Sequence, residues 1–348
     1  MKLSIITTVY KAEKDLPRLL ESMMAQKSPE LEFFLIDNGS PDRCGEICRE
    51  YANKDSRFTV YTLAENIGYI RARNLGLEVC DGDYIGFCDS DDYLEPGGYD
   101  RAVEILKKTD CDFYASAYKT IFPGRKQVNL LPYDTGLYEA AAIRETLLPQ
   151  LFGPLPGKLM HHGFMWKHVL RRSIVTANSI RFYEPLKPYE DQLFNIDVMK
   201  HSRRVYIDDT ILYNYIVNEQ SITAKLVENF DARAEWQRIK GLYEQKLRRC
   251  ENQAEHTALS NQAVRYIFVL ALNMVKCRQL SHRESVRLLR EFSGDGTIRT
   301  CCRDAAAVDK PTGFTKLCLL CGQYGLLLRA IEAAMKLRRS RFMQGGST

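Results

Sequence analysis

The chain has 348 residues, of which 45% are hydrophobic and 27% are charged, as is usual for a globular protein long enough for two domains. Its formal net charge of +5 is mild, so charge gives no reason to expect a protein that binds nucleic acid. It has no uninterrupted apolar run of the ~18 residues that span a bilayer, and its first residues lack the basic and apolar segments of a secretion signal, so we expect a cytoplasmic protein.

The first third of the chain alternates between strand-like and helix-like segments. A strand is predicted at residues 3–9, and the apolar side chains from Leu16 to Met24 then follow the spacing of an amphipathic helix. Further strands are predicted at residues 31–36, 58–61, 84–88 and 113–118, with a helix at residues 69–79 and another that Pro96 opens. This alternation predicts an α/β fold in which helices flank a mostly parallel, doubly wound central sheet.

The character of the sequence changes near residue 226. Strand signals fade there, and long helical patterns rich in Arg, Lys, Glu and Leu follow. We therefore expect an α/β domain at residues 1–225 and a helical C-terminal region at residues 226–348.

Three carboxylates follow the strand at residues 84–88, because Asp89, Asp91 and Asp92 stand within four residues. Ligands of open α/β sheets bind at the carboxyl ends of the strands, and clustered carboxylates repel one another unless a cation or water neutralises them. Mg²⁺ and Mn²⁺ prefer oxygen ligands, and Mg²⁺ combines one or two carboxylates with substrate phosphates. We infer a divalent metal ion on Asp91, with Asp89, that bridges to a diphosphate. The alternative is a solvated acidic turn before the helix that Pro96 opens.

The surroundings of these carboxylates resemble the core of the family-2 glycosyltransferases. The similar segments stand in the family's order: Ile5–Tyr10, Ile36–Asp42, Glu65–Gly68, Arg71–Gly76, Asp81–Phe87 and Asp89–Asp92. Each segment alone is common, but the ordered set is specific, and the resemblance covers about residues 1–225. It implies a GT-A fold, which is Rossmann-like, and an enzyme that uses a nucleotide-sugar donor with Mn²⁺ or Mg²⁺.

In that family, the segments after the first and second strands hold the nucleotide. By resemblance, Thr8, Tyr10, Asp37 and Asn38 are expected to line the pocket of the base and ribose. The family often has two aspartates where this chain has Asp37 and Asn38, and an Asn side chain both accepts and donates hydrogen bonds. Uridine and thymidine nucleotides therefore both stay open. Without the resemblance, residues 37–40 would be an ordinary turn.

The same resemblance implies the remaining donor contacts. Asn66, Asp89 and Ser90 are expected to contact the nucleotide-sugar, and Asp91 with Asp89 to hold the metal. Arg73 is expected to bind the diphosphate or the ribose, because a guanidinium binds phosphate through two parallel hydrogen bonds. A surface arginine on a helix is the alternative for Arg73.

Glu190 and Asp191 precede a helical pattern and resemble the Glu-Asp motif in which the family carries its catalytic base. We expect Asp191 to take the proton from the acceptor hydroxyl, with Glu190 as the second candidate or as an orienting neighbour. Such a base implies direct displacement with inversion at the anomeric carbon. Without the resemblance, two acidic residues in the first turn of a helix would simply suit its dipole.

Other segments match the family less specifically. Trp166 is interpreted either as a platform for a sugar face or as a core residue, and His161 and His162 as loop residues rather than as acceptor or metal groups. The segments Tyr213–Tyr215 and Ser221–Thr223 resemble the part that closes the family's catalytic domain, where they would approach the diphosphate.

The C-terminal region has an apolar run at residues 317–328 with Lys336, Arg338, Arg339 and Arg341 after it. Basic helices of this kind lie on anionic membranes; the alternative is a helix packed on the protein's own core with basic residues near its C-terminal end. We expect this region to contact the acceptor, the inner face of the cell membrane or a second copy of the chain.

Eleven cysteines are present, an odd number that cannot all pair within one chain. We expect reduced thiols that pack as small hydrophobes. Cys301, Cys302, Cys318 and Cys321 would offer four zinc ligands, but adjacent cysteines are awkward ligands and leucines flank the second pair.

Together these patterns predict an inverting glycosyltransferase that moves a sugar from a UDP- or dTDP-sugar to a hydroxyl of a saccharide or lipid-linked acceptor, as in polysaccharide biosynthesis. The alternatives are an inactive nucleotide-sugar-binding relative and a nucleotidyltransferase, which would release pyrophosphate rather than a nucleoside diphosphate. A glycoside hydrolase also uses paired carboxylates but needs no nucleotide pocket. The sequence identifies neither the sugar nor the acceptor.

Overall fold

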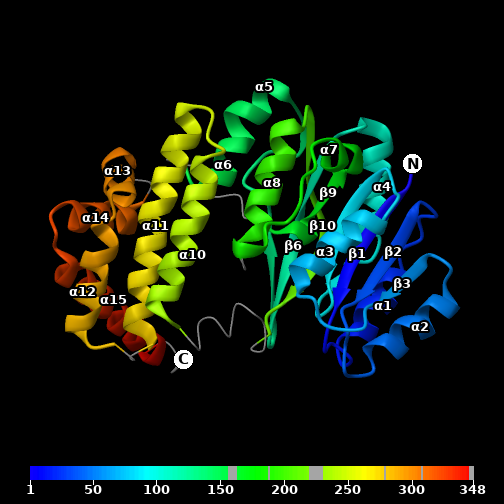
Figure 1. Cartoon of the computed structure of the whole chain (residues 1–348), viewed down its shortest axis with the longest axis horizontal. Helices are drawn as coiled ribbons and strands as arrows, with labels where there is room; N and C mark the ends of the chain where they lie inside the picture. The colour runs from blue at the N-terminus through cyan, green and yellow to red at the C-terminus, as the bar shows by residue number, and fades with distance from the viewer. Residues whose placement is uncertain (156–162, 187–188, 219–229, 278–279, 307–308, 345–348) are drawn as a thin grey trace. The chain divides into compact units, whose positions relative to one another are not determined.

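The computed structural model describes residues 1–155, 163–186, 189–218, 230–277, 280–306 and 309–344 (Figure 1). The chain divides into two compact units. The sheet unit comprises residues Met1–Leu148 and His162–Asn218, and the helical unit comprises residues Pro149–His161 and Glu219–Thr348. The assignment of Pro149–His161 to the helical unit is a feature that the sequence patterns did not indicate.

A mixed sheet forms the centre of the sheet unit. Its strands are β1 (Leu3–Val9), β2 (Leu31–Asp37), β3 (Phe58–Thr62), β4 (Tyr84–Asp89), β5 (Tyr93–Leu94), β6 (Phe113–Phe122), β7 (Arg125–Asn129), β8 (Gly136–Glu139), β9 (His168–Arg171) and β10 (Arg204–Ile216). The strand order is β3-β2-β1-β4-β9-β6-β10-β5, with β7 paired to β6 and β8 to β10.

The sheet is mixed, with the GT-A-like, mostly parallel character that was expected; β5, β7, β8 and β9 are its antiparallel strands. Strands β1 to β4 pair in parallel, and so do β6 and β10. Strand β9 lies between these two sets and is antiparallel to both β4 and β6. The sequence did not predict β9, because a strand of four residues carries little periodic signal.

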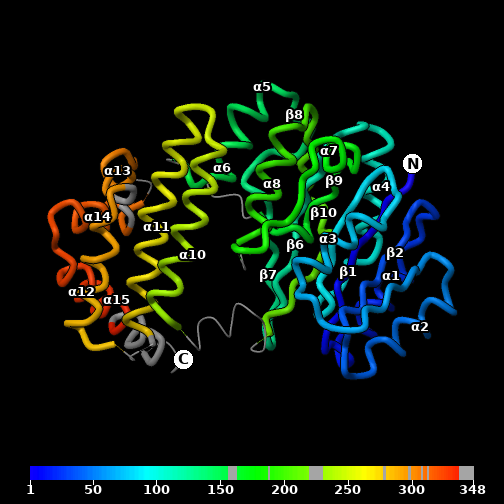
Figure 2. Tube along the Cα trace, viewed as in Figure 1, coloured from blue at the N-terminus to red at the C-terminus, as the bar shows by residue number. Residues whose placement is uncertain are grey.

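Helices flank this sheet. They are α1 (Leu16–Met24), α2 (Cys44–Lys54), α3 (Tyr69–Val79), α4 (Gly98–Thr109), α5 (Ala140–Ala142), α7 (Arg172–Ala177) and α8 (Glu190–His201), with the short turns η1 (Ile143–Leu147), η2 (Met165–Lys167) and η3 (Glu184–Leu186). Helix α3 packs on β1 and β2, α4 on β10, and α7 on β4 and β9. The helix that Pro96 was expected to open begins at Gly98, and the chain path through these elements can be followed in Figure 2.

Strands β1 and β2 are buried along almost their whole length. Leu3, Ile5, Phe33 and Leu35 have no exposed surface, and they belong to one hydrophobic cluster that also includes side chains of α1, α2 and α4. Strands of a parallel sheet that are covered on both faces lack the alternation of half-exposed strands.

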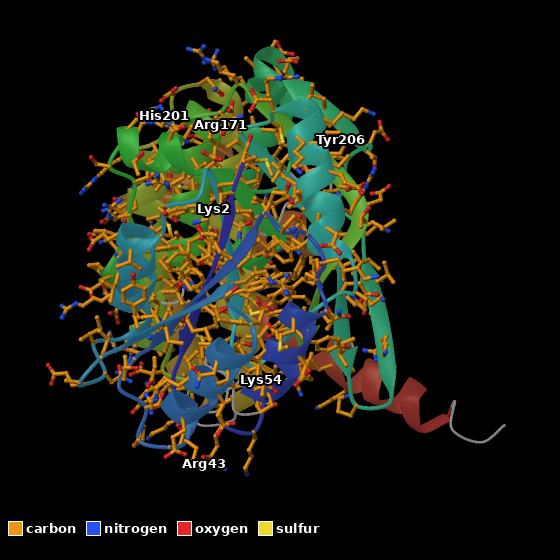
Figure 3. All side chains as sticks on the ribbon, turned by 90° about the vertical axis from the view of Figure 1, so that its right-hand side faces the viewer. Lys2, Arg43, Lys54, Arg171, His201 and Tyr206 are labelled. Carbon is orange, nitrogen blue, oxygen red and sulfur yellow. The ribbon has the colours of Figure 1, made fainter. Side chains whose placement is uncertain are left out.

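Ion pairs hold the end of the sheet where β1 and β4 begin. Lys2 pairs with Asp81 at 3.1 Å, and Arg171 pairs with Asp112 at 2.8 Å; Lys2 and Arg171 are labelled in Figure 3.

The helical unit consists of α6 (Leu148–Phe152), α10 (Ala232–Leu247), α11 (Gln253–Cys277), α12 (His282–Ser293), α13 (Gly296–Asp304), α14 (Lys310–Leu320) and α15 (Tyr324–Gln344), with α6 beginning at the boundary. Helices α10 and α11 lie side by side (Figure 1). Trp236 stacks on Phe292 at 4.9 Å inside the unit's own hydrophobic core.

The apolar run at residues 317–328 is divided between core and surface. Cys318, Leu327 and Leu328 are buried, whereas Leu317 is 59% and Leu320 53% exposed. The core alternative therefore holds for one part of the run, and the other part faces solvent. Within the described ranges, no helix is both long enough and apolar enough to span a bilayer.

The ten cysteines whose side chains the structure describes are free thiols. Cys301, Cys302 and Cys318 are buried in α13 and α14, and burial raises the pKa of each of these thiols. Cys321 is exposed. Buried neutral thiols of this kind act as small hydrophobes.

Candidate active site

The carboxyl ends of β1, β2 and β4 meet at one edge of the sheet. Val9 pairs with Asp37 across β1 and β2, and Thr8 pairs with Asp89 across β1 and β4. Three predicted donor residues are thus neighbours because parallel strands end together, and this edge is where ligands of open α/β sheets bind.

Two loops at this edge are tied together by Asn38. Its Oδ1 atom accepts a hydrogen bond from the amide of Ile67 at 3.0 Å, and its Nδ2 atom donates to Oδ1 of Asn66 at 3.3 Å. Gly39 has a positive φ of 65°, and a Cβ there would lie 2.4 Å from the backbone of Glu65. The turn after β2 and the loop before α3 therefore pack directly on each other.

The predicted nucleotide residues differ in exposure. Asp37 and Asn38 are each 2% exposed, and Asp37 accepts a hydrogen bond from the amide of Ser40 at 3.1 Å. Tyr10 is 40% exposed, and Thr8 is partly exposed. Asp37 and Asn38 thus shape the turn, while Tyr10 and Thr8 offer accessible surface beside it.

The three carboxylates after β4 divide into two kinds. Asp92 is 1% exposed, and its carboxylate accepts hydrogen bonds from the Tyr213 hydroxyl at 2.8 Å and from the Ile216 amide at 2.7 Å. Asp92 therefore ties the turn to β10. Asp89 and Asp91 stay partly exposed, as does Ser90 between them.

Asp91 lies in an environment that disfavours a bare carboxylate. Burial and, next, the charge of Asp89 raise the pKa of Asp91 to about 6. Its backbone carbonyl accepts a hydrogen bond from Arg18 of α1 at 2.6 Å, a contact that the sequence did not indicate. The charge of Arg18 lowers the pKa of Asp91, but burial and the charge of Asp89 outweigh it, so a further cation would stabilise the charged carboxylate.

Arg73 brings distant acidic residues together. Its Nη2 atom lies 2.9 Å from Oδ1 of Asp89 at the end of β4. Its Nη1 atom lies 2.9 Å from Oδ1 of Asp191 and 3.3 Å from Oε1 of Glu190, both at the start of α8. The Arg73 guanidinium is 10% exposed and thus joins the two acidic sites that the sequence singled out.

Asp191 is held in place from several sides. Its Oδ2 atom accepts a hydrogen bond from the Met165 amide at 3.4 Å, and its backbone carbonyl accepts one from Asn195 at 2.8 Å. Burial raises the pKa of Asp191 to about 7, and the charge of Glu190 adds to this shift while Arg73 opposes it. A carboxylate with a pKa near neutrality is suited to act as a general base.

Asn195 is a positioning residue that the sequence analysis missed. It is fully buried, and its Nδ2 atom also donates to the carbonyl of Gly163 at 2.9 Å, while its Oδ1 atom lies 2.9 Å from Nδ1 of His168. One signal in the sequence could have indicated this role: Asn195 is an amide side chain on an otherwise apolar helix face, one turn after Asp191.

Trp166 belongs to the core rather than to a sugar platform. It is 4% exposed and stacks on Tyr213 at 4.6 Å and on Tyr215 at 5.8 Å. Asn214 is also buried and donates to Glu95 at 2.8 Å. His161, His162 and Ser221–Thr223 lie outside the described residues.

A divalent metal ion fits the donor set at the end of β4. Asp89 and Asp91 offer hard oxygen ligands, and Mg²⁺ needs only one or two carboxylates when phosphates complete its shell. In the described part of the chain, no three His, Cys, Asp or Glu side chains form a ready-made metal site.

Known proteins resemble this chain in sequence and in fold. The model of Glycosyl transferase family 2 matches residues 4–171. The uncharacterized glycosyltransferase EpsJ of Bacillus subtilis is 30% identical over 231 residues, which are 63% of this chain and 62% of EpsJ. The chain thus spans less than two thirds of the length of this relative.

A second relative is the poly(ribitol-phosphate) beta-N-acetylglucosaminyltransferase TarS of Staphylococcus aureus, 26% identical over 224 residues that make up 63% of this chain and 36% of TarS. The crystal structure of TarS 1-349 in complex with UDP-GlcNAc matches with a TM-score of 0.71 and 19% identity, over 96% of this chain and 92% of that one. The mannosyltransferase PcManGT of Pyrobaculum calidifontis, in complex with GDP-Man and Mn2+, matches with a TM-score of 0.55 and 13% identity, over 94% of this chain and 86% of that one.

At such identities the solved structures establish a shared fold, and the family match adds sequence similarity along β1 to β9. The ordered segments that suggested this family from the sequence lie around the sheet edge and the carboxylates described above. Over residues 4–171 the chain is similar to glycosyl transferase family 2, and its fold is the GT-A-like fold of the TarS structure.

Proposed function

We propose that the protein is an inverting glycosyltransferase that moves a sugar from a nucleoside-diphosphate-sugar to a hydroxyl of a saccharide or lipid-linked acceptor in polysaccharide biosynthesis. The observation that carries this proposal is the Arg73 guanidinium, which contacts Asp89 on the donor side and Asp191 on the other. Sugar transfer requires the leaving diphosphate and the catalytic base that deprotonates the acceptor to lie in one site. Correct positioning of the reacting groups accounts for much of the rate acceleration.

Asp191 is the base in this proposal. It takes the proton of the acceptor hydroxyl while that oxygen forms a bond to the anomeric carbon and the bond from this carbon to the diphosphate oxygen breaks. The Met165 amide and Arg73 hold the carboxylate, and Glu190 orients Arg73. A single displacement inverts the anomeric configuration.

Asp91, with Asp89, would hold Mn²⁺ or Mg²⁺. When bound, the ion would act as a Lewis acid that stabilises charge on the departing diphosphate. Arg73 is also a candidate for the diphosphate, and its N–H donors contact the carboxylates of Glu190 and Asp89. Thr8, Tyr10, Asp37, Asn38, Asn66 and Ser90 remain the proposed contacts of the nucleotide-sugar.

The donor is proposed to be a UDP- or dTDP-sugar. TarS, whose fold matches best among the structures described above, was solved with UDP-GlcNAc, whereas PcManGT was solved with GDP-Man. The fold alone therefore does not identify the nucleobase of the donor, which has to be measured.

The products distinguish this proposal from its alternatives. With an accepted donor and acceptor, a glycosyltransferase releases the nucleoside diphosphate and an elongated acceptor, whereas a nucleotidyltransferase releases pyrophosphate. Mass spectrometry and NMR of the anomeric proton after incubation with UDP- and dTDP-sugars identify the products. Release of pyrophosphate, or retention of the donor's anomeric configuration, would overturn the proposal; nucleotide binding without turnover would favour an inactive relative.

The activity is expected to fall at acidic pH. The base must be deprotonated to work, and the pKa of Asp191 is raised to about 7 by burial, so kcat/KM should be high above pH 7 and fall about tenfold for each pH unit well below it. The measurement is the pH profile of kcat/KM for the acceptor. A profile that is flat from pH 5 to pH 8 would exclude Asp191 as a base with this pKa.

The exposed apolar face of α14 is proposed to rest on an anionic membrane. Phe314, Leu317 and Leu320 recur every three residues and are 38%, 59% and 53% exposed, and the exposed Lys310 on the same helix supplies positive charge. Replacing Leu317 and Leu320 with Glu should strongly reduce cosedimentation with phosphatidylglycerol vesicles.

The matched control for this prediction lies in the sheet unit, where Val128 and Leu130 are 52% and 60% exposed. Their replacement with Glu should leave cosedimentation unchanged. Equal loss in both pairs, or no vesicle binding by the unchanged protein, would contradict the membrane role; a mass in solution that halves in the Leu317 and Leu320 variant would identify the face as a contact between two copies.

A further inference from the structure

Lys167 is a buried lysine without an anionic partner. It is 2% exposed, and its Nζ atom lies 5.7 Å from the centre of the Tyr118 ring and 5.8 Å from that of the Phe164 ring. Among the described residues, no carboxylate or carbonyl oxygen accepts a hydrogen bond from it. Burial alone lowers its pKa to about 7, whereas buried lysines in folded proteins are normally paired.

Lys246 in the helical unit shows the ordinary solution for a buried lysine. It has no exposed surface, and burial lowers its pKa to about 7 as well. However, its Nζ atom donates to the carbonyls of Leu151 at 2.9 Å and Phe152 at 3.1 Å, at the end of α6. Lys246 therefore stabilises the end of α6, and no comparable hydrogen bond of Lys167 is seen among the described residues.

The segment that carries Lys167 is tied to the helix of the proposed base. It ends the turn η2, whose Met165 amide donates to Asp191. Asn195 donates both to the Gly163 carbonyl and to the Asp191 carbonyl, so the segment Gly163–Lys167 and the start of α8 are fixed to each other. A group bound by this segment would therefore be held in a fixed position relative to Asp191.

Phe164, in the same segment, presents an aromatic ring to solvent. It is 39% exposed and stacks on the buried Trp166 at 5.1 Å with an angle of 9° between the rings. Tyr118 packs edge-on against Trp166 at 4.8 Å. A rigidly supported aromatic face with a polar group beside it is typical of sites that bind small polar molecules.

We propose that Phe164, Tyr118 and Lys167 form an acceptor subsite, in which Lys167 binds a phosphate-type oxyanion of the acceptor. This inference rests on the proposed function and narrows its acceptor to an anionic saccharide or polyol. The oxyanion would supply the negative charge that Lys167 lacks, and the Phe164 ring would cover the carbon face of the acceptor.

The unfavourable effect of the buried Lys167 on the stability of the folded state supports a role in binding. An unpaired buried charge destabilises the folded state, and its replacement by an apolar residue of similar volume is often neutral or stabilising. Residues that are unfavourable for stability but needed for ligands are concentrated in functional sites. Lys167→Met should therefore keep or raise the melting temperature, whereas Lys246→Met should lower it.

The test uses the full-length chain with Trp236 replaced by Phe, so that Trp166 is its one remaining tryptophan. Its fluorescence is titrated with glycerol 3-phosphate and with glycerol, in the presence of UDP and Mn²⁺. Binding of glycerol 3-phosphate but not of glycerol is expected. Lys167→Met should weaken glycerol 3-phosphate binding at least about tenfold, the value of one charged hydrogen bond, with UDP affinity unchanged; Lys246→Met should leave both affinities unchanged.

Each other outcome is decisive. Equal binding of glycerol 3-phosphate by the unchanged protein and Lys167→Met, or no binding by either, would overturn the subsite while UDP binding upholds the proposed function. Weaker UDP binding in Lys167→Met, with glycerol 3-phosphate unaffected, would assign the lysine to the donor's diphosphate and overturn the acceptor assignment. Failure of the unchanged protein to bind UDP or any other nucleotide would count against the proposed function instead.

Discussion

Replacing Asp191 with Asn is expected to lower the rate of sugar transfer by about 10²- to 10⁴-fold, the usual contribution of a general base. The Asn side chain has nearly the same shape, but it cannot take up a proton. Arg73 keeps its contacts with Asp89 and Glu190, so the affinity for the donor nucleotide should not change. Initial rates of nucleoside diphosphate release and calorimetric UDP binding, on one preparation, measure both quantities.

Glu190→Gln is the matched control for this prediction. Glu190 is 3% exposed and contacts Arg73 at the longer distance of 3.3 Å, so its replacement should reduce activity less than that of Asp191. If Glu190→Gln abolished transfer while Asp191→Asn remained active, Glu190 would be the base. Loss of UDP binding in Asp191→Asn would instead indicate a role on the donor side.

Replacing Arg73 with Met is expected to damage both stability and activity. The change leaves the carboxylates of Asp89, Glu190 and Asp191 without their shared cation, and breaking a buried ion pair typically costs about 3–5 kcal/mol. The pKa of Asp191 should rise further, because the charge of Arg73 opposes its upward shift more than the Met165 amide does. Chemical unfolding measures the loss of stability, and the pH profile of the residual activity measures the shift in pKa.

Two controls separate charge from geometry at Arg73. Arg71, on the same helix, is 63% exposed and pairs with the exposed Glu184, so Arg71→Met should change stability little. Arg73→Lys keeps the charge but lacks the fork that reaches two carboxylates at once, so it should recover part of the stability and little of the activity. Equal effects of Arg71→Met and Arg73→Met would contradict the central role of Arg73.

The sheet edge at the carboxyl ends of β1, β2 and β4 could be predicted from the sequence, because short local segments mark where these strands end. Asp37 and Asp89 each end a strand, and parallel neighbouring strands place their carboxyl ends together. Turn residues and apolar runs mark those ends along the chain. The GT-A fold and the position of the carboxylates therefore followed from strand prediction and family resemblance.

Contacts between distant segments could not be predicted in the same way. Arg73 and Asp191 are 118 residues apart, and motif order alone does not show that they touch. Asp92 looked equivalent to Asp89 and Asp91, but Tyr213 and Ile216 of β10 occupy its carboxylate. Asp92 connects its turn to β10, whereas Asp91 can bind a ligand. This difference depends on how β10 packs beside the turn, which the local sequence does not show.

Burial was equally hidden from the sequence. Trp166 fits a sugar platform and a core position equally well as a residue type, and the exposed ring is that of its neighbour Phe164. Lys167 reads as an ordinary surface lysine, yet it is almost fully enclosed. Neither distinction has a periodic signal, because the turn η2 is only three residues long.

The most direct test of the account is the binding of UDP, dTDP, GDP and CMP, each with and without Mn²⁺, to the unchanged protein and to Asp91→Ala. The account predicts that UDP or dTDP binds in the presence of Mn²⁺ and that Asp91→Ala loses this binding. Absence of binding to all four nucleotides, or metal-independent binding that Asp91→Ala retains, would contradict it.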